Sequence, residues 1–150
     1  MDALGQGAHV ELTRHTGSLR VLVIDDDPSV STAIQAILSR RNGETEIASR
    51  AHAGIHALAA SDFDIVLIDL FMPGLSGLDT IAHIRRGRTI PILAMSGFRL
   101  RQLSDSDDYL EMAMQRGATG WLRKPFSPQQ LVEAIDNCLS AGSCARDPIP

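Results

Sequence analysis

Short apolar runs alternate with helical patterns along most of this chain, and that alternation leaves few folds open. Five runs are typical of strands, at residues 20–24, 44–49, 65–68, 90–95 and 119–123. Helical patterns follow them at about residues 28–38, 52–60, 78–86, 109–115 and 128–139. Strands that alternate with helices over short links form parallel sheets that are covered on both faces. We therefore predict a doubly wound α/β domain with a five-stranded parallel sheet.

The two ends of the chain lack this alternation. Residues 1–18 contain Gly, His, Thr and Ser without periodicity, so we expect a flexible N-terminal tail there. The domain is predicted to cover residues 19–140, with its first strand starting at Arg20, and residues 141–150 are predicted to form a C-terminal tail. Asp27 directly precedes Pro28, a residue favoured at the first helical position, so we predict that Asp27 is a helix N-cap.

Size and charge argue against several classes of protein. The chain has 150 residues and is 44% hydrophobic, which suits one globular domain and leaves no room for a second. Its formal net charge of -4 argues against general nucleic-acid binding. No apolar run reaches membrane-spanning length and the N-terminus lacks a signal-peptide core, so we expect a cytoplasmic protein. Cys138 and Cys144 lack metal-ligand spacing and are interpreted as free thiols.

Residues that can do chemistry stand where the predicted strands end. Asp25 and Asp26 follow the first strand, Asp69 the third, Ser96 the fourth and Lys124 the fifth. The carboxyl ends of parallel strands meet at one edge of a sheet, which is where such folds bind ligands. We therefore expect these side chains to lie close together, although they are far apart in the sequence.

Their chemistry points to phosphoryl transfer. Crowded carboxylates repel one another and need a cation, and an all-oxygen site suits Mg²⁺. The only lysine among the 14 Lys and Arg residues is Lys124, which adds a positive charge. Ser96 can donate a hydrogen bond to an anion. A metal, an ammonium group, a hydroxyl and an accepting carboxylate are what a phosphoryl acceptor requires.

Four motifs carry a resemblance to a known family. They are Val-Leu-Val-Ile-Asp25-Asp26-Asp27-Pro28, Asp69-Leu-Phe-Met72-Pro73-Gly74, Ala-Met-Ser96-Gly97 and Lys124-Pro125-Phe126. Together, and in this order, they resemble the receiver domains of two-component response regulators over residues 19–140. The resemblance implies the flavodoxin-like receiver fold and a single-domain protein of the stand-alone chemotaxis-regulator type.

The resemblance also implies roles for individual residues. Asp69 would be the phosphoacceptor, and Asp26 and Asp69 would bind Mg²⁺ directly, together with the backbone carbonyl of Phe71. Asp25 would bind the ion through water. Ser96 would be the switch hydroxyl and Lys124 the phosphate partner. The Lys124-Pro125 peptide bond would be cis.

Three aromatic residues depart from the family pattern. Trp121 stands where receivers usually carry a Tyr or Phe that turns inward with the switch hydroxyl, so it is either a switch residue or a packed surface aromatic. Phe71 and Phe98 flank the expected route of attacking water. Two apolar rings there would restrict water and prolong the acyl phosphate, unless the rings pack away from the site.

The resemblance implies partners as well. The phosphoryl group would come from a sensor histidine kinase or a histidine phosphotransfer protein. The signal would pass to a protein target through the face formed by the helix at residues 109–115, the strand at 119–123 and the last helix, without contact to nucleic acid or membrane. The segment 97–108 next to this face is longer than usual and is either functional or a solvated loop. Diffusible switch, relay intermediate and phosphate sink remain open.

Two other functions compete with a phosphoacceptor that turns over no substrate and dephosphorylates itself slowly. A haloacid-dehalogenase-like phosphatase would use Asp25 as nucleophile and Asp27 as general acid. That family's motif normally continues with a small residue and Thr, whereas Pro28 and Ser29 follow here. A receiver fold that binds partners without being phosphorylated is the third interpretation.

Overall fold

The computed structural model describes residues 13–14, 17–72, 74–97 and 103–146, and for residues 13–14, 103–108 and 142–146 it describes the backbone alone. The strands are β1 (Thr13–Arg14), β2 (Gly17–Ile24), β3 (Gly43–Ala48), β4 (Ile65–Asp69), β5 (Ile92–Ser96) and β6 (Gly120–Arg123). The helices are α2 (Pro28–Ser39), α3 (Ala51–Ala60), α4 (Gly77–Gly87), α5 (Leu103–Arg116) and α6 (Pro128–Arg146).

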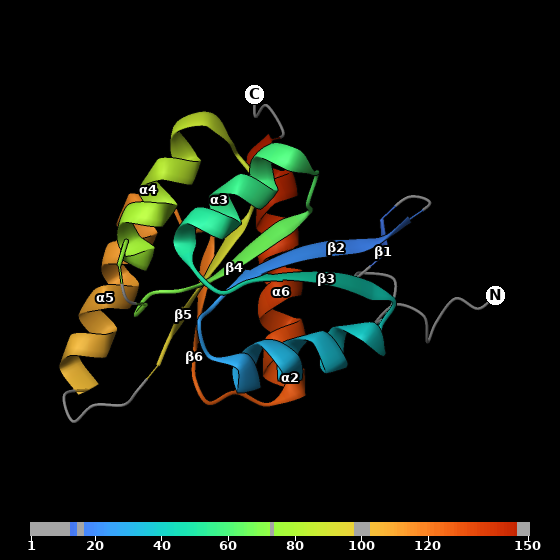
Figure 1. The fold of residues 1–150 in the computed structure, drawn as a ribbon, viewed down its shortest axis with the longest axis horizontal. Coiled ribbons are helices and arrows are strands. Elements are labelled where there is room, and N and C mark those ends of the chain that lie inside the picture. The colour runs from blue at the N-terminus through green and yellow to red at the C-terminus, as the bar shows by residue number, and fades with distance from the viewer. Residues whose placement is uncertain (1–12, 15–16, 73, 98–102, 147–150) are drawn as a thin grey trace.

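The five main strands are parallel and lie in the order β3-β2-β4-β5-β6. Helices α2 and α6 cover one face of the sheet, and α3, α4 and α5 cover the other (Figure 1). Alternate residues of the central strands β2, β4 and β5 pack into two separate cores, as in Val21 and Val23 on one face and Leu22 and Ile24 on the other. The predicted doubly wound fold is confirmed.

The boundaries differ from the predicted ones by more than two residues in three places. The first strand begins at Gly17, before Arg20, and its first residues pair antiparallel with β1. Helix α5 begins at Leu103, within the segment expected to be a loop, and α6 continues to Arg146. Backbone pairing and helix extension at these positions follow no apolar periodicity, so the sequence pattern could not place them.

Asp27 is the N-cap of α2, as predicted. Its Oδ1 accepts hydrogen bonds from the backbone N–H of Ser29 at 3.0 Å and from the Ser29 hydroxyl at 2.8 Å. These bonds lower the pKa of the Asp27 carboxyl, because they favour its charged form. The cap fixes the start of α2 directly after the acidic turn.

Arg85, near the end of α4, donates hydrogen bonds to three backbone carbonyls in the loops that follow α4 and α5. Its guanidinium donates two hydrogen bonds to the carbonyl of Gly117, at 2.9 and 2.7 Å, and one each to Arg88 and Ile90. Burial lowers the pKa of this guanidinium. The contacts tie the end of α4 to the segments that lead into β5 and β6, far from the carboxyl edge of the sheet.

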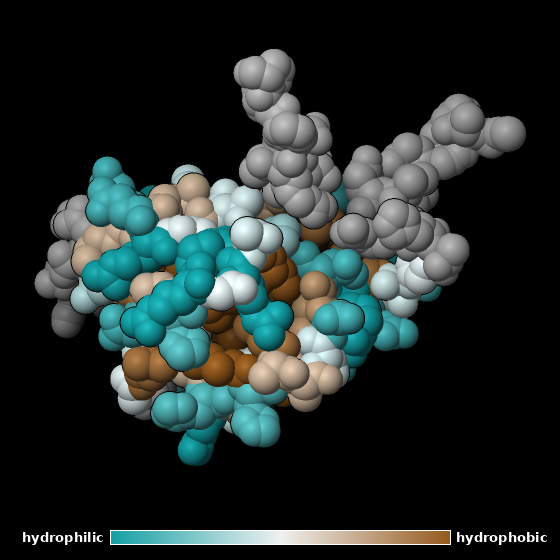
Figure 2. All heavy atoms as spheres, turned by 90° about the horizontal axis from the view of Figure 1, so that it is seen from above, coloured by the Kyte–Doolittle hydropathy of each residue, from teal (hydrophilic) through white to brown (hydrophobic). Residues whose placement is uncertain are grey.

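The view onto α3 and α4 from above is mainly hydrophilic, with an area of hydrophobic residues near its centre (Figure 2).

Gly77 lets the start of α4 approach the end of β4. A Cβ atom at this position would lie 2.5 Å from both the carbonyl oxygen of Asp69 and the Cα of Leu70. We expect Gly77→Ala to lower the free energy of unfolding by about 1–3 kcal/mol, since backbone atoms cannot yield as side chains do. Chemical denaturation measures this. Gly87→Ala is the matched control in the same helix, because a Cβ there meets nothing within 4 Å. Equal midpoints for the two variants would contradict the close approach.

Candidate functional site at the carboxyl edge of the sheet

Asp69 is the last residue of β4 and is only 4% exposed. The strand is buried along its whole length, and its pairing with β5 places Asp69 opposite Met95. The Asp69 Oδ1 lies 3.4 Å from the Lys124 Nζ and accepts a hydrogen bond from the backbone N–H of Phe71 at 3.3 Å. A buried carboxylate is thus held at the strand end by one cation and one backbone donor.

Asp25 follows β2 and is buried to a similar degree, with 1% exposure. Its Oδ2 lies 2.8 Å from the Lys124 Nζ, and its Oδ1 accepts the N–H of Asp27 at 2.9 Å. Its own backbone N–H donates to the carbonyl of Ala48 in β3. Lys124 therefore bridges two buried carboxylates that come from neighbouring strands.

Asp25, Asp26 and Asp69 form one acid cluster. One carboxylate oxygen of each lies within 4.8 Å of the others, and Asp26 is exposed where the other two are buried. Three carboxylates around a solvent opening, with only one lysine among them, leave negative charge that a divalent cation would neutralise. The donor set is all oxygen, which fits Mg²⁺. The predicted Mg²⁺ site thus fits the residues that are present.

The electrostatics of Asp69 follow from this setting. Burial, together with the neighbouring charge of Asp25, raises the pKa of Asp69 to about 6, although Lys124 opposes both effects. At neutral pH the Asp69 carboxylate is ionised, and keeping this charge buried costs free energy of folding. A second cation at the cluster would lower that cost.

Ser96 and Lys124 complete the edge. Ser96 ends β5 and is fully buried, and its hydroxyl donates to the carbonyl of Gly97 at 3.3 Å. The Ser96 carbonyl accepts the backbone N–H of Lys124 at 2.9 Å, so the two residues are held in fixed register. The Lys124-Pro125 bond is cis, in agreement with the resemblance.

The aromatic side chains near this edge make contacts of their own. Trp121 is 48% exposed, with the Arg123 guanidinium 5.3 Å from its ring centre. The Phe71 ring is 40% exposed and packs edge-on against Tyr109 of α5. Phe98 lies outside the described residues. The contact with Tyr109 had no signal in the sequence, because nothing in a helical pattern identifies which loop residue it will meet.

The structure thus defines a class of protein: doubly wound α/β domains with a cluster of acids, bridged by a lysine, at the carboxyl edge of the sheet. The family profile of the response regulator receiver domain matches residues 21–136. The chain belongs to the response regulator receiver domain family.

Individual relatives agree with this assignment. The transcriptional activator protein PfeR of Pseudomonas aeruginosa is 31% identical over 132 residues, which cover 88% of this chain and 41% of that protein. The nitrate/nitrite response regulator protein NarL of Escherichia coli is 31% identical over 118 residues, which cover 77% of this chain and 52% of that protein. The chain spans about half the length of the curated relatives it matches.

Solved structures share the fold. A response regulator receiver domain protein from Clostridium thermocellum superposes with a TM-score of 0.73 at 27% identity, over 85% of this chain and 98% of that one. A receiver domain protein from Methanospirillum hungatei gives 0.73 at 23% identity, with the same coverage. In the described part of this chain, no helix combines the length and apolar character needed to cross a membrane.

Proposed function

We propose that Asp69 accepts a phosphoryl group from the phosphohistidine of a sensor histidine kinase or of a histidine phosphotransfer protein. The observation that carries the proposal is the position of the Asp69 carboxylate. It is buried at a strand end, 3.4 Å from the Nζ of Lys124 and within an acid cluster that suits a divalent cation. Membership of the receiver family supports the same chemistry.

In the proposed reaction an Asp69 carboxylate oxygen attacks phosphorus while the bond between phosphorus and the donor's imidazole nitrogen breaks. The imidazole leaves with the bonding electron pair and takes a proton from solvent, and Asp69 keeps an acyl phosphate. The Lys124 ammonium and the Ser96 hydroxyl are proposed to bind the transferred phosphoryl oxygens.

Mg²⁺ would be held directly by the Asp26 and Asp69 carboxylates and the Phe71 carbonyl, and through water by Asp25. When bound, it supplies positive charge that neutralises phosphoryl oxygens. Ser96 ends β5 and Lys124 directly follows β6, so both would reach the phosphoryl group from the strands beyond β4.

The chain is proposed to be an acceptor that dephosphorylates itself slowly, and not a phosphatase that turns over substrates. A phosphatase of the dehalogenase type needs Asp25 free to attack and Asp27 free to donate a proton. Here the Asp25 carboxylate is engaged by Lys124 and by the N–H of Asp27, and the Asp27 carboxylate caps α2. The capping role of Asp27 takes up the carboxyl that the phosphatase would need as general acid, and this favours Asp69 as the proposed reactive group.

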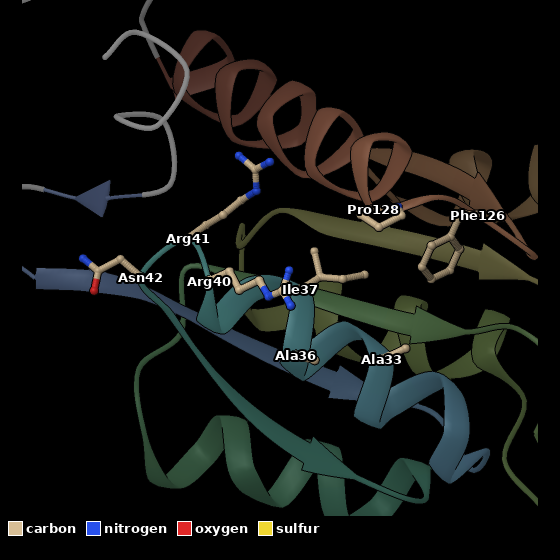
Figure 3. Close-up of a pocket in the computed structure, with 8 residues that line it drawn as sticks. All are labelled: Ala33, Ala36, Ile37, Arg40, Arg41, Asn42, Phe126 and Pro128. Carbon is tan, nitrogen blue, oxygen red and sulfur yellow. The ribbon is translucent and has the colours of Figure 1, made fainter. Parts of the chain in front are cut away.

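A groove between α2 and α6 reaches from Phe126, two residues after Lys124, to the end of α2, and we propose it as a place for the phosphodonor (Figure 3). Its lining consists of Ala33, Ala36, Ile37, Arg40, Arg41, Asn42, Phe126 and Pro128. Ile37 points from α2 toward α6, and Phe126 follows the Lys124-Pro125 bond closely (Figure 3). An apolar floor of small side chains with arginines at one end suits a helix that carries apolar and acidic residues. We propose that the donor docks here.

Ala33→Arg tests the docking and the phosphoacceptor role together. An uncompensated arginine on the groove floor should slow phosphotransfer from a cognate kinase by about tenfold or more. Labelling by acetyl phosphate, which needs no docking, should not change. Gln35→Arg adds the same charge to an exposed position of α2 outside the groove and is the control. Equal slowing with both donors would show damage to the site, and no slowing with the kinase would place docking elsewhere.

Output is proposed to pass through protein contacts on the face formed by α5, β6 and α6. Met114 and Trp121 are exposed large apolar residues on this face, and a hollow there is also lined by Leu122, Ala134 and Cys138. The relative PfeR is a transcriptional activator, and that output is a property of the longer relative. Trp121 is proposed to contact the partner directly. An inward switch would first have to break its contact with Arg123.

A further inference from the structure

Phe71 and Tyr109 form an aromatic pair that links the loop after β4 to α5. Their ring centroids are 4.8 Å apart and the ring planes meet at 73°, an edge-to-face arrangement that aromatic rings favour. Both side chains are partly exposed, at 40% and 37%. Burial alone therefore does not fix either ring, and the contact between them does.

The loop around Phe71 is anchored on both sides. Leu70 and Met72 are buried in the core beneath α4 and α5, and the Leu70 N–H donates to the Met95 carbonyl at 2.9 Å. Phe71 lies between these anchors. Its backbone N–H bonds the Asp69 carboxylate at 3.3 Å, which is long for such a bond and leaves it sensitive to small movements of the loop.

Tyr109 is well placed to hold this residue. The next residue, Leu110, and Ala113 one turn on are buried in the same core as Leu70 and Met72, so α5 is packed firmly on the loop. The Tyr109 ring therefore extends from a helix that is fixed by its packing against α4, β5 and β6. Through the Phe71 ring it acts on the backbone group that touches the acceptor.

We propose that Tyr109 is a positioning residue for the acceptor site: by holding the Phe71 ring it keeps the Phe71 backbone aligned with Asp69. This inference rests on the proposed phosphoacceptor function, and it adds a residue from α5 to the site. It also provides a path by which the state of Asp69 reaches α5, one element of the proposed output face. Trp121, on the outer surface of β6, makes no such contact in this structure.

The energy of the contact between the two rings limits how much Tyr109 can affect the acceptor site. Edge-to-face pairs contribute enough to shift an equilibrium by about 2- to 12-fold. We expect Tyr109→Ala to weaken Mg²⁺ binding and to slow labelling by acetyl phosphate within that range. Tyr109→Phe keeps the ring and should behave like the wild type. Met112→Ala removes an equally exposed side chain one turn along α5 and should also leave both properties unchanged.

Nuclear magnetic resonance of the metal-free protein measures the chemical shift of the Phe71 amide proton. A merely structural role of Tyr109 would leave this shift unchanged. The proton should shift upfield in Tyr109→Ala, as its bond to Asp69 weakens, and keep its position in Tyr109→Phe and Met112→Ala. Mg²⁺ affinity is measured separately by calorimetry.

A double-mutant cycle gives the sharpest test. If Tyr109 acts through Phe71, Tyr109→Ala should have no further effect on labelling or on Mg²⁺ affinity once Phe71→Ala is present. Additive effects, or an unmoved Phe71 amide, would overturn the inference. Failure of the proposed function looks different, because then the wild type itself would acquire no label from acetyl phosphate.

Discussion

Replacing Lys124 with Met should lower the free energy of unfolding by about 3–5 kcal/mol, because it leaves buried carboxylates without their cation. The Lys124 Nζ lies 2.8 Å from Asp25 and 3.4 Å from Asp69, and these two side chains are 0% and 5% exposed. Met keeps the apolar stem, so the loss reports the charge and not the packing. Labelling of Asp69 by acetyl phosphate should also fall by about 10²- to 10³-fold, since an electrostatic partner of the phosphoryl group is lost.

Arg116→Met is the matched control for stability. Arg116 pairs with Asp79 at 3.6 Å, but both side chains are exposed, at 39% and 62%. Removing an exposed pair costs about 1 kcal/mol or less. Denaturation of Lys124→Met and Arg116→Met without metal measures the difference between their free energies of unfolding. A Lys124→Met protein as stable as Arg116→Met would mean that Lys124 does not compensate the cluster. Mg²⁺ should restore part of the stability lost in Lys124→Met by supplying charge to the same carboxylates.

Asp69→Asn should stabilise the metal-free domain at neutral pH, although it removes the proposed acceptor. The pKa of Asp69 is raised from 3.8 to about 6, chiefly by burial. The folded state therefore binds more protons than the unfolded state between these values, and stability falls as pH rises through this window. Above pH 6 the full penalty is present and amounts to about 3 kcal/mol. The neutral amide avoids it.

Unfolding measured in a chelator across pH 4 to 8 checks the sign. The advantage of Asp69→Asn should be full well above pH 6 and shrink to a small remainder at pH 4, because the wild-type carboxyl is protonated in both states only below its unfolded pKa of 3.8. Asp26→Asn removes a carboxyl that is exposed, so its gain should be smaller. An Asp69→Asn protein less stable than wild type at pH 7 would show that the contacts of the carboxylate outweigh its burial. Added Mg²⁺ should narrow the gap by stabilising the wild type.

Much of the fold and of the site could be predicted because both depend on local pattern. Residues 65–68, for example, are apolar throughout, and a short run of this kind is typical of a strand that is buried on both faces of a sheet. A parallel sheet then brings the ends of its strands together, so Asp25, Asp69 and Lys124 had to be neighbours. The cap at Asp27 followed from two adjacent residues.

The features that could not be predicted depend on tertiary contacts. The sequence left open whether Phe71 shields the acceptor, and in the structure its ring packs on Tyr109, which only the placement of α5 decides. The exposed position of Trp121 beside Arg123 likewise depends on tertiary packing around β6. The early start of α5 at Leu103 lies in a polar segment, where helix and loop patterns look alike.

The most direct measurement is the chemical location of the phosphoryl group. The protein is incubated with Mg²⁺ and acetyl phosphate, treated with borohydride to reduce any acyl phosphate, and digested for mass spectrometry. We expect a single hydroxylamine-sensitive adduct, with the reduced residue at position 69, that is present in Asp25→Asn and absent from Asp69→Asn. An adduct at Asp25, or steady hydrolysis of phosphomonoesters that requires Asp25, would contradict the assignment of Asp69 as phosphoacceptor.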